Sequence, residues 1–514
     1  MMNVCTTIIE SPRLPVSLEL SGDEVKAVAG TDGQSSCTAT LPPIYPEWLG
    51  DRAFSATHGA RFNYVVGEMA RGIATPRMVV EAVRAGCLGF YGSAGLPLTE
   101  IERGLREIKA ALSPDQISWG ANLIHTPQQP GYEADVVDLF LREGVRRVSA
   151  SAYMRLSPEI VRYTALGLQR GPDGRILRTN HVFAKVSRAE VAEQFLAPAP
   201  DAILKQLVEA GAITGEQADL ASTVPVAAEI TAEADSGGHT DRRSAAPLFS
   251  SICAARDRVA TKTGIDPDII RIGLAGGIAT PHAVAAAFSM GAAYVLTGSI
   301  NQAAVESGLS LPGRQLLAKA GPADVAMAPA ADMFEQGVEV QVLKRGTLFA
   351  MRGKKLFQFY RSGAAFETLD SNDQAWVEDV LGEPFESAWQ ATREYIRTVN
   401  PKEAERAEAD GNKRLALVAR RYLFSGAQLA REGNPARLAD YQIWCGPAQG
   451  AFNEWGDGTF LEDISNRTVS QIAWNLMEGA ARITRAAQLR AVGVAVPPSA
   501  FNYIPQQFAE SEAA

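Results

Sequence analysis

Three glycine-containing turns in this sequence could together hold one phosphate group. They lie in the segments ITAEADSGGHTDRR, IRIGLAGGIATP and AYVLTGS, each of which begins with apolar residues. Such turns let backbone N–H groups approach an anion, and a helix that starts after Thr280 would add the positive end of its dipole. A tight strand-to-helix connection explains any one of these turns by itself. Three of them at strand ends favour a phosphorylated cofactor.

Two side chains near these turns could carry charge or move protons. His239 follows Gly237 and Gly238, and a histidine exchanges protons readily near neutral pH. A histidine that only caps the loop is the competing interpretation. Lys185 ends the apolar segment HVFAK, where an ammonium group is costly unless it meets an anion. The alternative is that its stem packs in the strand while its amine reaches the rim.

The elements that must position these residues repeat along the chain. GIATPRMVVEAVRAG (72–86) aligns without a gap with GIATPHAVAAAFSMG (277–291), and in both copies Thr-Pro starts a helix between two apolar segments. Eight apolar segments are expected to be strands: NYVVGEMA, LGFYGSAG, ISWGANLI, RRVSAS, NHVFAKV, PVAAEITAEA, IRIGLA and AYVLTGS. Eight parallel strands predict an α/β fold, a TIM (β/α)8-type barrel, with an open doubly wound sheet as the alternative.

The composition divides the chain into three parts. Residues 1–48 are expected to form a partly irregular extension, and residues 49–325 the barrel, with a helical insertion at about 187–222. In residues 326–514, aromatic and aliphatic residues three and four apart predict an additional, mainly helical C-terminal domain that packs beside or over the barrel. Its clearest segments are DQAWVEDVLGEPFESAWQATREYI and VSQIAWNLMEGAARITRAAQLRAV.

Charge and cysteine content narrow the functional class. The 514-residue chain has a formal net charge of −9, which argues against nucleic acid as a partner. Its five cysteines are scattered, without a CxxC pair or a Cys/His cluster, so no metal site is expected. The chain from Ile272 to Ser299 lacks charged residues, but its Ala, Gly and Pro content argues against a membrane span. The absence of a secretory signal favours a cytoplasmic location.

A basic run lies in the otherwise acidic C-terminal part. The segment VLKRGTLFAMRGKKL carries the cations Lys344, Arg345, Arg352, Lys354 and Lys355. A local basic patch can steer an acidic partner even when the net charge is negative. Plain solvated surface is the competing interpretation. We retain the patch as a hypothetical docking site.

The chain resembles the PfaD family, the stand-alone, trans-acting enoyl reductases of polyketide and polyunsaturated fatty-acid synthases. These are similar in turn to nitronate monooxygenases and to flavin-dependent bacterial enoyl-carrier-protein reductases. The resemblance begins near residue 46 and rests on GEMARGIATP, WGANLIHTP, VSASAYM, AEADSGGHTD, GLAGGIATP, YVLTGSINQAAVESGLS, DVAMAPAADMFEQGVEVQVLKRGTLFAMRGKKL and DYQIWCGPAQGAFNEW. The last three segments separate this group from the general nitronate monooxygenase pattern.

The resemblance implies a barrel that binds FMN and a helical domain that covers the active site. Lys185 is expected to stabilise the anionic reduced flavin, and His239 matches a histidine that related enzymes carry near the substrate. These two are the expected catalytic residues. The expected cofactor-binding residues are Gly67, Glu68, Met69, Asn122, Lys185, Gly237, Gly238, Gly276, Gly277, Gly298 and Ser299.

The resemblance also implies a reaction and a partner. NADPH would reduce FMN, and hydride would then pass to the β-carbon of an enoyl thioester that is bound to an acyl carrier protein. Two alternatives stay open: a flavin oxygenase that acts on nitronates, and a non-catalytic module that binds FMN or acyl chains in a synthase complex. The oligomeric state is open as well, with a homodimer as one option.

Overall fold

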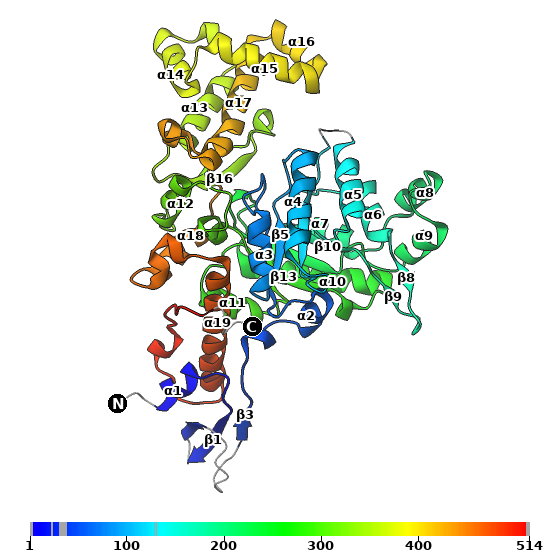
Figure 1. The fold of residues 1–514 in the computed structure, drawn as a ribbon, viewed down its shortest axis with the longest axis vertical. Helices are drawn as coiled ribbons and strands as arrows, with labels where there is room; N and C mark the ends of the chain where they lie inside the picture. Colours follow the sequence, from blue (N-terminus) through cyan, green and yellow to red (C-terminus); the bar gives the residue numbers. More distant parts are fainter. Residues whose placement is uncertain (1–3, 22–23, 30–38, 128, 130, 510–514) are drawn as a thin grey trace. The chain divides into compact units, whose positions relative to one another are not determined.

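The computed structural model describes residues 4–21, 24–29, 39–127, 129 and 131–509 (Figure 1). The chain forms two compact units. Unit 1 comprises Met1–Asp235, Arg242–Gly308 and Glu454–Ala514, and unit 2 comprises Ser236–Asp241 and Leu309–Asn453. The chain therefore leaves unit 1 twice and returns to it twice.

Unit 1 contains a closed barrel of eight parallel strands, which confirms the predicted fold and excludes the open sheet. The strands follow one another around the barrel in chain order: β4 (Tyr64–Val66), β5 (Leu88–Tyr91), β6 (Trp119–Ile124), β7 (Arg147–Ser151), β10 (His181–Val186), β11 (Glu229–Glu233), β13 (Arg271–Ala275) and β14 (Val295–Thr297). Each lies inside one of the eight predicted segments. Most of their side chains are buried, as expected for parallel strands that are covered on both faces.

Helices surround the barrel, and one of them comes from the far end of the chain. Those that follow strands directly are α3 (Pro76–Arg84), α4 (Leu98–Ala111), α5 (Tyr132–Glu143), α6 (Pro158–Ala165), α7 (Ala189–Leu196), α10 (Ala245–Thr263) and α11 (Pro281–Ser289). α19 (Val469–Ala491) packs against both α11 and α3 (Figure 1). It thus occupies the helix position after β14, which makes residues 309–453 an insertion between the last strand and its helix.

The position of α19 differs from the predicted organisation. Its sequence pattern correctly predicts a helix, but residues 454–514 belong to the barrel unit instead of a separate C-terminal domain. The approach to α11 is close, because a Cβ atom at Gly479 would lie 2.6 Å from Cγ of Pro281. Toward α3, the Trp474 indole donates a 3.0 Å hydrogen bond to the carbonyl of Ala85.

Both copies of the Thr-Pro phrase start helices in the predicted way. The Thr75 hydroxyl accepts a hydrogen bond from the N–H of Met78 at 3.0 Å, and Thr280 accepts one from Ala283 at 3.4 Å. Each threonine is an N-cap that is followed by proline at the first helical position, where no N–H is needed. The repeat therefore encodes the same strand-to-helix connection twice.

The described part of the N-terminal extension is folded. It forms α1 (Val4–Glu10) and an antiparallel hairpin of β1 (Val16–Ser21) and β2 (Glu24–Ala29), followed by β3 (Ala39–Leu41) and α2 (Arg52–His58). Ile8 and Leu18 pack against Leu489 near the end of α19. The buried Arg485 of α19 donates hydrogen bonds to the carbonyls of Pro12 and Pro42 at 3.1 and 2.6 Å. Contacts with α19, which is distant in sequence, thus help to hold the described part of this segment in place.

The predicted helical insertion at about 187–222 forms α7, α8 (Asp201–Glu209) and α9 (Gly215–Ala221). Of these, α7 occupies the ordinary barrel position and packs against α10. The other two are additional helices in the connection from β10 to β11. A short hairpin of β8 (Gln169–Arg170) and β9 (Ile176–Leu177) precedes β10.

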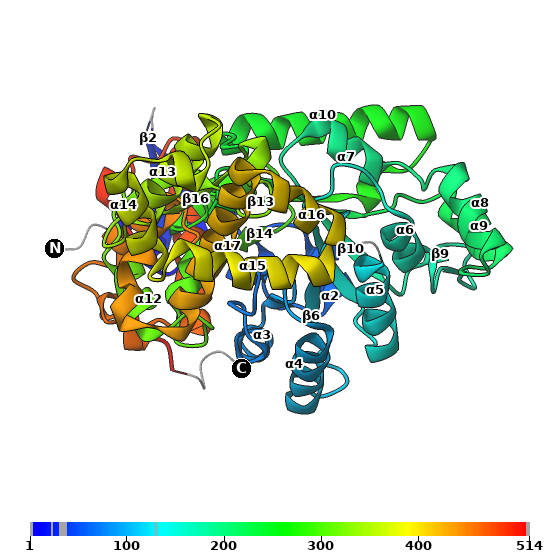
Figure 2. The ribbon, with the colours of Figure 1, turned by 90° about the horizontal axis from the view of Figure 1, so that it is seen from above.

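Unit 2 is mainly helical, as predicted, but it also contains a sheet. Its helices are α12 (Leu311–Ala318), α13 (Phe349–Arg361), α14 (Ser371–Leu381), α15 (Phe385–Val399), α16 (Pro401–Ala409) and α17 (Gly411–Glu432) (Figure 2). The chain leaves the unit through α18 (Ala448–Gly456). The predicted helical segment at 373–396 breaks at Gly382, which has a φ of +74°. A three-stranded antiparallel sheet joins β12 (Gly238–His239), β16 (Glu339–Leu343) and β15 (Val325–Pro329). The alternation in VEVQV was its signal in the sequence.

Candidate active site

The predicted residues of unit 1 lie at one end of the barrel. Because the strands are parallel, their carboxyl ends form a single rim, where barrel enzymes carry their active sites. Glu68 follows β4, Lys185 lies near the end of β10, Gly276 and Gly277 follow β13, and Gly298 follows β14. Since β13 and β14 are paired, these last two glycine turns are neighbours.

The glycines on this rim are needed for different reasons. A Cβ atom at Gly276 would lie 2.5 Å from the backbone of Ala234, so packing alone requires glycine there. At Gly277 and Gly298 a Cβ atom would meet nothing within 4 Å. Gly298 has a φ of −122° and a ψ of −75°, so its φ lies outside the left-handed region that favours glycine. Neither packing nor a positive φ requires glycine at position 298, and the open space beside it fits a ligand that approaches the main chain.

Strained backbone is concentrated on the same rim. Among the described residues, the non-glycine positions with positive φ are Arg71 (58°), Ala152 (62°) and Arg242 (50°). They lie in the connections that follow β4, β7 and β11, respectively. A non-glycine residue with positive φ costs free energy, and such residues tend to occur at functional sites. Their distribution points to the carboxyl end of the barrel as the functional face.

Lys185 and Glu68 form an ion pair across the barrel. The Lys185 Nζ atom lies 2.8 Å from Oε1 of Glu68 and 3.4 Å from Oε1 of Glu233. In the barrel order, β10 and β4 are four strands apart in either direction, so the contact joins opposite walls. The Glu68 side chain is 2% exposed, whereas those of Lys185 and Glu233 are 16% and 22% exposed. Sequence reasoning missed Glu233, although it is the last residue of β11, at the same rim.

Charge dominates this group of three side chains, which we call the Lys185 cluster (Lys185, Glu68 and Glu233). Burial by itself would lower the pKa of Lys185, but the charges of Glu233 and Glu68 raise it above its usual value. Lys185 is therefore a stable ammonium ion. Both carboxylate oxygens of Glu68 are buried and lack a well-aligned hydrogen bond, so the 2.8 Å contact is an ion pair. The anions that the lysine meets belong to the protein itself.

Asn122 is buried and ties two strands together. Its side-chain amide donates 2.9 Å hydrogen bonds to the carbonyl of Ser149 and to the hydroxyl of Ser151, both on β7. The carbonyl of Asn122 accepts a hydrogen bond from the Ser93 hydroxyl at 2.7 Å. Both amide hydrogens thus have protein partners, and the side-chain oxygen is the group that could serve a ligand. Its predicted contact with FMN stays a prediction.

Gly237, Gly238 and His239 belong to unit 2, where they have structural partners. Gly238 and His239 form β12 beside β16, and a Cβ atom at Gly237 would lie 2.7 Å from the backbone nitrogen of Cys445. The His239 side chain is half-exposed, and its Nε2 lies 3.3 Å from Oδ1 of Asp332. Burial would raise the pKa of Asp332, but the hydrogen bond and charge of His239 lower it below its usual value. The roles of these residues toward phosphate and substrate stay predictions.

The basic run at 344–355 is largely neutralised. Arg352 donates a 2.5 Å hydrogen bond to Asp440, whose side chain is buried. Lys355 donates one to Asp373 at 2.8 Å and also lies 4.2 Å from the centre of the Trp376 ring. Lys344 and Lys354 are exposed. The run therefore serves mostly to fix helices, and only part of it is available for a partner.

A second polar cluster at the rim was missed by sequence reasoning. The Nδ1 atom of His125 lies 2.9 Å from Oε2 of Glu133, and the Tyr153 hydroxyl donates to Oε1 of the same carboxylate at 2.7 Å. Ser157 donates to it at 2.5 Å. His125, Glu133 and Ser157 line a cavity of about 320 Å³. The position of His125 directly after the strand in WGANLIHTP was the available signal.

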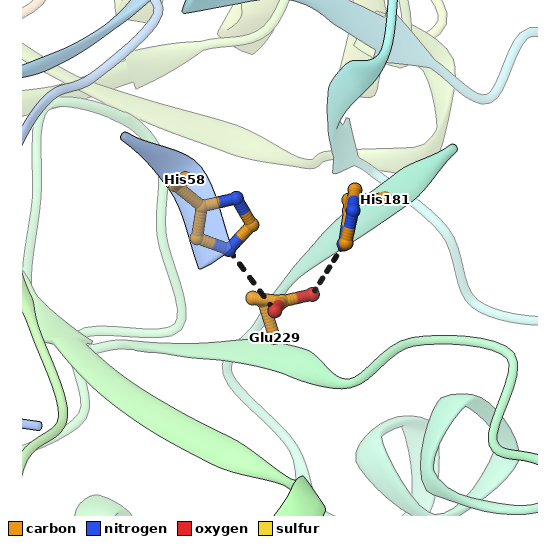
Figure 3. A group of neighbouring side chains, drawn as sticks. All are labelled: His58, His181 and Glu229. Atoms are coloured by element: carbon orange, nitrogen blue, oxygen red, sulfur yellow. Dashed lines mark hydrogen bonds and ion pairs between the residues drawn. The ribbon is translucent and has the colours of Figure 1, made fainter. Parts of the chain in front are cut away.

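A buried group at the opposite end of the barrel has potential metal ligands, namely His58, His181 and Glu229 (Figure 3). The Arg147 guanidinium donates a 3.1 Å hydrogen bond to Nδ1 of His58. His58 must therefore carry its proton on Nε2, which lies 3.1 Å from Glu229 and donates to it. Arg271 also pairs with Glu229. Two guanidinium groups and a protonated ring nitrogen make this a buried ion-pair network, unsuited to a metal cation.

The pKa values in this network follow from burial and charge. Burial lowers the pKa of His181 to about 3, and it also lowers the pKa of His58, although Glu229 partly opposes both shifts. For Glu229, burial alone would raise the pKa, but Arg271 and His58 hold it well below its usual value. Neutral histidines and an ionised glutamate therefore occupy the end of the barrel where the strands begin, which we call the barrel floor. The strand residues that meet here, His181 and Glu229, are the first residues of β10 and β11.

Comparison with known proteins identifies relatives over nearly the whole chain. The chain is 40% identical, over 92% of its length, to a subunit of the polyunsaturated fatty acid synthase of Thraustochytrium sp., and it spans 32% of that subunit. It is also 40% identical, over 84% of its length, to the polyketide biosynthesis protein PksE of Bacillus subtilis, of which it spans 56%. The chain thus spans about a third to a half of these relatives.

A solved structure covers most of the chain. The enoyl reductase domain of MlnA, from the macrolactin biosynthesis cluster of Bacillus amyloliquefaciens, is 36% identical to it with a TM-score of 0.81. The match covers 87% of this chain and 99% of that domain. Residues 364–441, in unit 2, match a family described as the inserted helical domain of [acyl-carrier-protein] S-malonyltransferase. In the described part of the chain, each helix is too short or too polar to cross a membrane.

Proposed function

Because this chain belongs to the PfaD family, we propose that it reduces the α,β-double bond of enoyl thioesters in polyketide or polyunsaturated fatty-acid biosynthesis. The observation that carries the proposal is the 36% identity to an enoyl reductase domain that the chain covers to 99%. The relatives named for polyketide and polyunsaturated fatty-acid synthesis support the same pathway class. An acyl carrier protein is the proposed partner that presents the substrate.

The residues on the barrel rim fit FMN as the cofactor. The open space beside Gly277 and Gly298 suits a phosphate that is held by backbone N–H groups, with Ser299 next to it. The Lys185 ammonium, which Glu68 pairs with at 2.8 Å, lies at the same rim. Bound FMN would supply the redox chemistry, a hydride exchange between NADPH and the enoyl thioester. Gly67, Met69 and Asn122 are proposed to line its ring.

The protein itself would contribute position and protons. Lys185 holds a positive charge at the barrel mouth, that is, at the rim formed by the carboxyl ends of the strands, because two carboxylates keep it protonated. His239, with Asp332 at 3.3 Å, is the proposed donor of the proton that the α-carbon needs. Gly237 and Gly238 would place this histidine through the short strand β12.

One assay tests this function against its alternatives. The purified protein is examined for flavin absorbance, and NADPH oxidation is followed without oxygen in the presence of an enoyl thioester on a carrier protein. Anaerobic turnover is expected. Consumption of a nitronate that depends on oxygen would indicate a flavin oxygenase instead. Flavin or acyl binding without either activity would indicate a non-catalytic module of a synthase complex.

A further inference from the structure

We propose that Glu68 and Glu233 oppose the charge of Lys185 and thereby lower the reduction potential of the flavin that this site binds. The inference rests on the proposed FMN-dependent function and adds two residues that tune it. The carboxylates lie 2.8 and 3.4 Å from the Lys185 ammonium. The Lys185 cluster combines one positive charge with two negative charges. Over these three side chains alone the charges sum to −1, whereas Lys185 by itself would present a positive charge.

Burial separates the roles of the three side chains. Glu68 is 2% exposed and both of its oxygens are buried, so it acts on a ligand through Lys185 and is a positioning residue. Lys185 and Glu233, at 16% and 22% exposed, reach the open side of the rim. The Lys185 ammonium, although paired with both carboxylates, can still donate a hydrogen bond to a ligand on this side. The ion pair from β4 holds that donor in place from across the barrel.

The sign of the effect follows from elementary electrostatics. Reduction adds negative charge to a flavin, so a nearby cation favours the reduced form and a nearby anion disfavours it. Interactions between charges are stronger in a poorly solvated site than in water. Removal of either carboxylate should therefore raise the reduction potential, and removal of the ammonium should lower it. General damage to the site would move all variants in the same direction.

The test measures the midpoint potential of bound FMN by anaerobic spectroscopic titration. Glu68→Gln and Glu233→Gln are expected to shift the potential upward, and Lys185→Met downward. Glu100→Gln is the matched control, because it removes the same charge from an α4 side chain that is 43% exposed. This control should leave the potential unchanged. Retained FMN absorbance in each variant shows that the measured potential belongs to the intact site.

The outcomes separate this inference from the proposed function. If the wild-type protein binds no FMN, both the proposed function and this inference are overturned. If it binds FMN but both carboxylate variants keep or lower the potential, only the inference is overturned. Should Glu68→Gln fail to fold, the more exposed Glu233→Gln still decides the sign. An upward shift in that variant together with a downward shift in Lys185→Met supports the inference.

Discussion

The Lys185 ammonium and the Glu68 carboxylate lie 2.8 Å apart although their strands are on opposite sides of the barrel. Such a pair binds two walls together at the end of the barrel where chemistry is expected. It also explains why a lysine is tolerated inside the otherwise apolar strand β10. Because the Glu68 side chain is nearly inaccessible, its carboxylate depends on Lys185 for compensation of its charge.

The first prediction concerns the coupling of this pair in the protein without cofactor. Lys185→Met would leave the Glu68 carboxylate buried without its nearest counter-charge, at a cost of about 3–5 kcal/mol in the free energy of unfolding. The double variant Lys185→Met/Glu68→Leu should be less destabilised than Lys185→Met alone. Urea unfolding of both variants and of Glu68→Leu measures the coupling. Simple addition of the two single costs would contradict the proposed dependence.

The second prediction separates glycines that the fold requires from glycines that a ligand requires. Gly298→Ala places a methyl group in open space at a negative φ, so the stability of the apoprotein should change little. If phosphate approaches the main chain there, FMN affinity should fall about tenfold or more, which corresponds to about 1.4 kcal/mol. Gly276→Ala is the matched control, because its methyl group would collide with Ala234 and destabilise the protein. Unchanged FMN affinity in Gly298→Ala would remove this turn from the phosphate site.

The third prediction concerns His239 as a proton donor. His239→Ala should retain FMN and its reduction by NADPH, while reduction of the enoyl thioester slows by about 10²–10⁴-fold. Asp332→Asn should produce a smaller loss, because it removes only the carboxylate 3.3 Å from the imidazole. Stopped-flow absorbance follows the two half-reactions separately. Full turnover of the thioester by His239→Ala would exclude the histidine from catalysis.

The fourth prediction concerns acid sensitivity of the barrel floor. Burial lowers the pKa of His181 to about 3, against about 6.5 in an unfolded chain. Below about pH 6.5 the unfolded state takes up the proton first, so the free energy of unfolding should fall as pH decreases toward 3. The slope per histidine approaches about 1.4 kcal/mol per pH unit. The same reasoning applies to His58, whose pKa burial also lowers.

Unfolding measured between pH 7 and pH 5 checks this prediction. The low pKa of Glu229 stabilises the fold above about pH 4.3, and this contribution is lost only at lower pH, outside the measured window. His181→Gln should flatten the pH dependence, because it removes one of the two groups. An equal slope in that variant and in the wild type would show that His181 is not responsible.

The fifth prediction revises the hypothetical docking site. Lys354 is exposed, and Lys354→Glu should raise the KM for a carrier-bound substrate several-fold without changing the melting temperature. A small thioester mimic should show no such effect. Lys355→Glu should instead lower the melting temperature of the protein, because it replaces a cation that is paired with Asp373 and stacked on Trp376. An equal KM effect on both substrates would argue against docking at Lys354.

Local signals in the sequence determined most of the barrel. The eight strands were recognisable because parallel strands are apolar on both faces, and the Thr-Pro starts of α3 and α11 because capping depends on a few consecutive residues. Gly382 and the alternating residues of β16 are also local signals in the sequence. The helical pattern of the neighbouring residues hid both signals, so neither the break nor the strand was predicted. The PfaD motifs, which are likewise short continuous segments, indicated residues of the rim.

Tertiary structure decided what depends on distant partners. The sequence placed Lys185 at a strand end and required an anion for it, but only closure of the barrel brings Glu68 of the opposite wall to 2.8 Å. Likewise, the helical pattern of α19 does not reveal that this helix returns to the barrel beyond an inserted unit. Helix and strand periodicity reflects interactions within a few residues, whereas ion pairs and helix packing join segments that are more than a hundred residues apart. The charge of the candidate site is therefore a property of the folded chain.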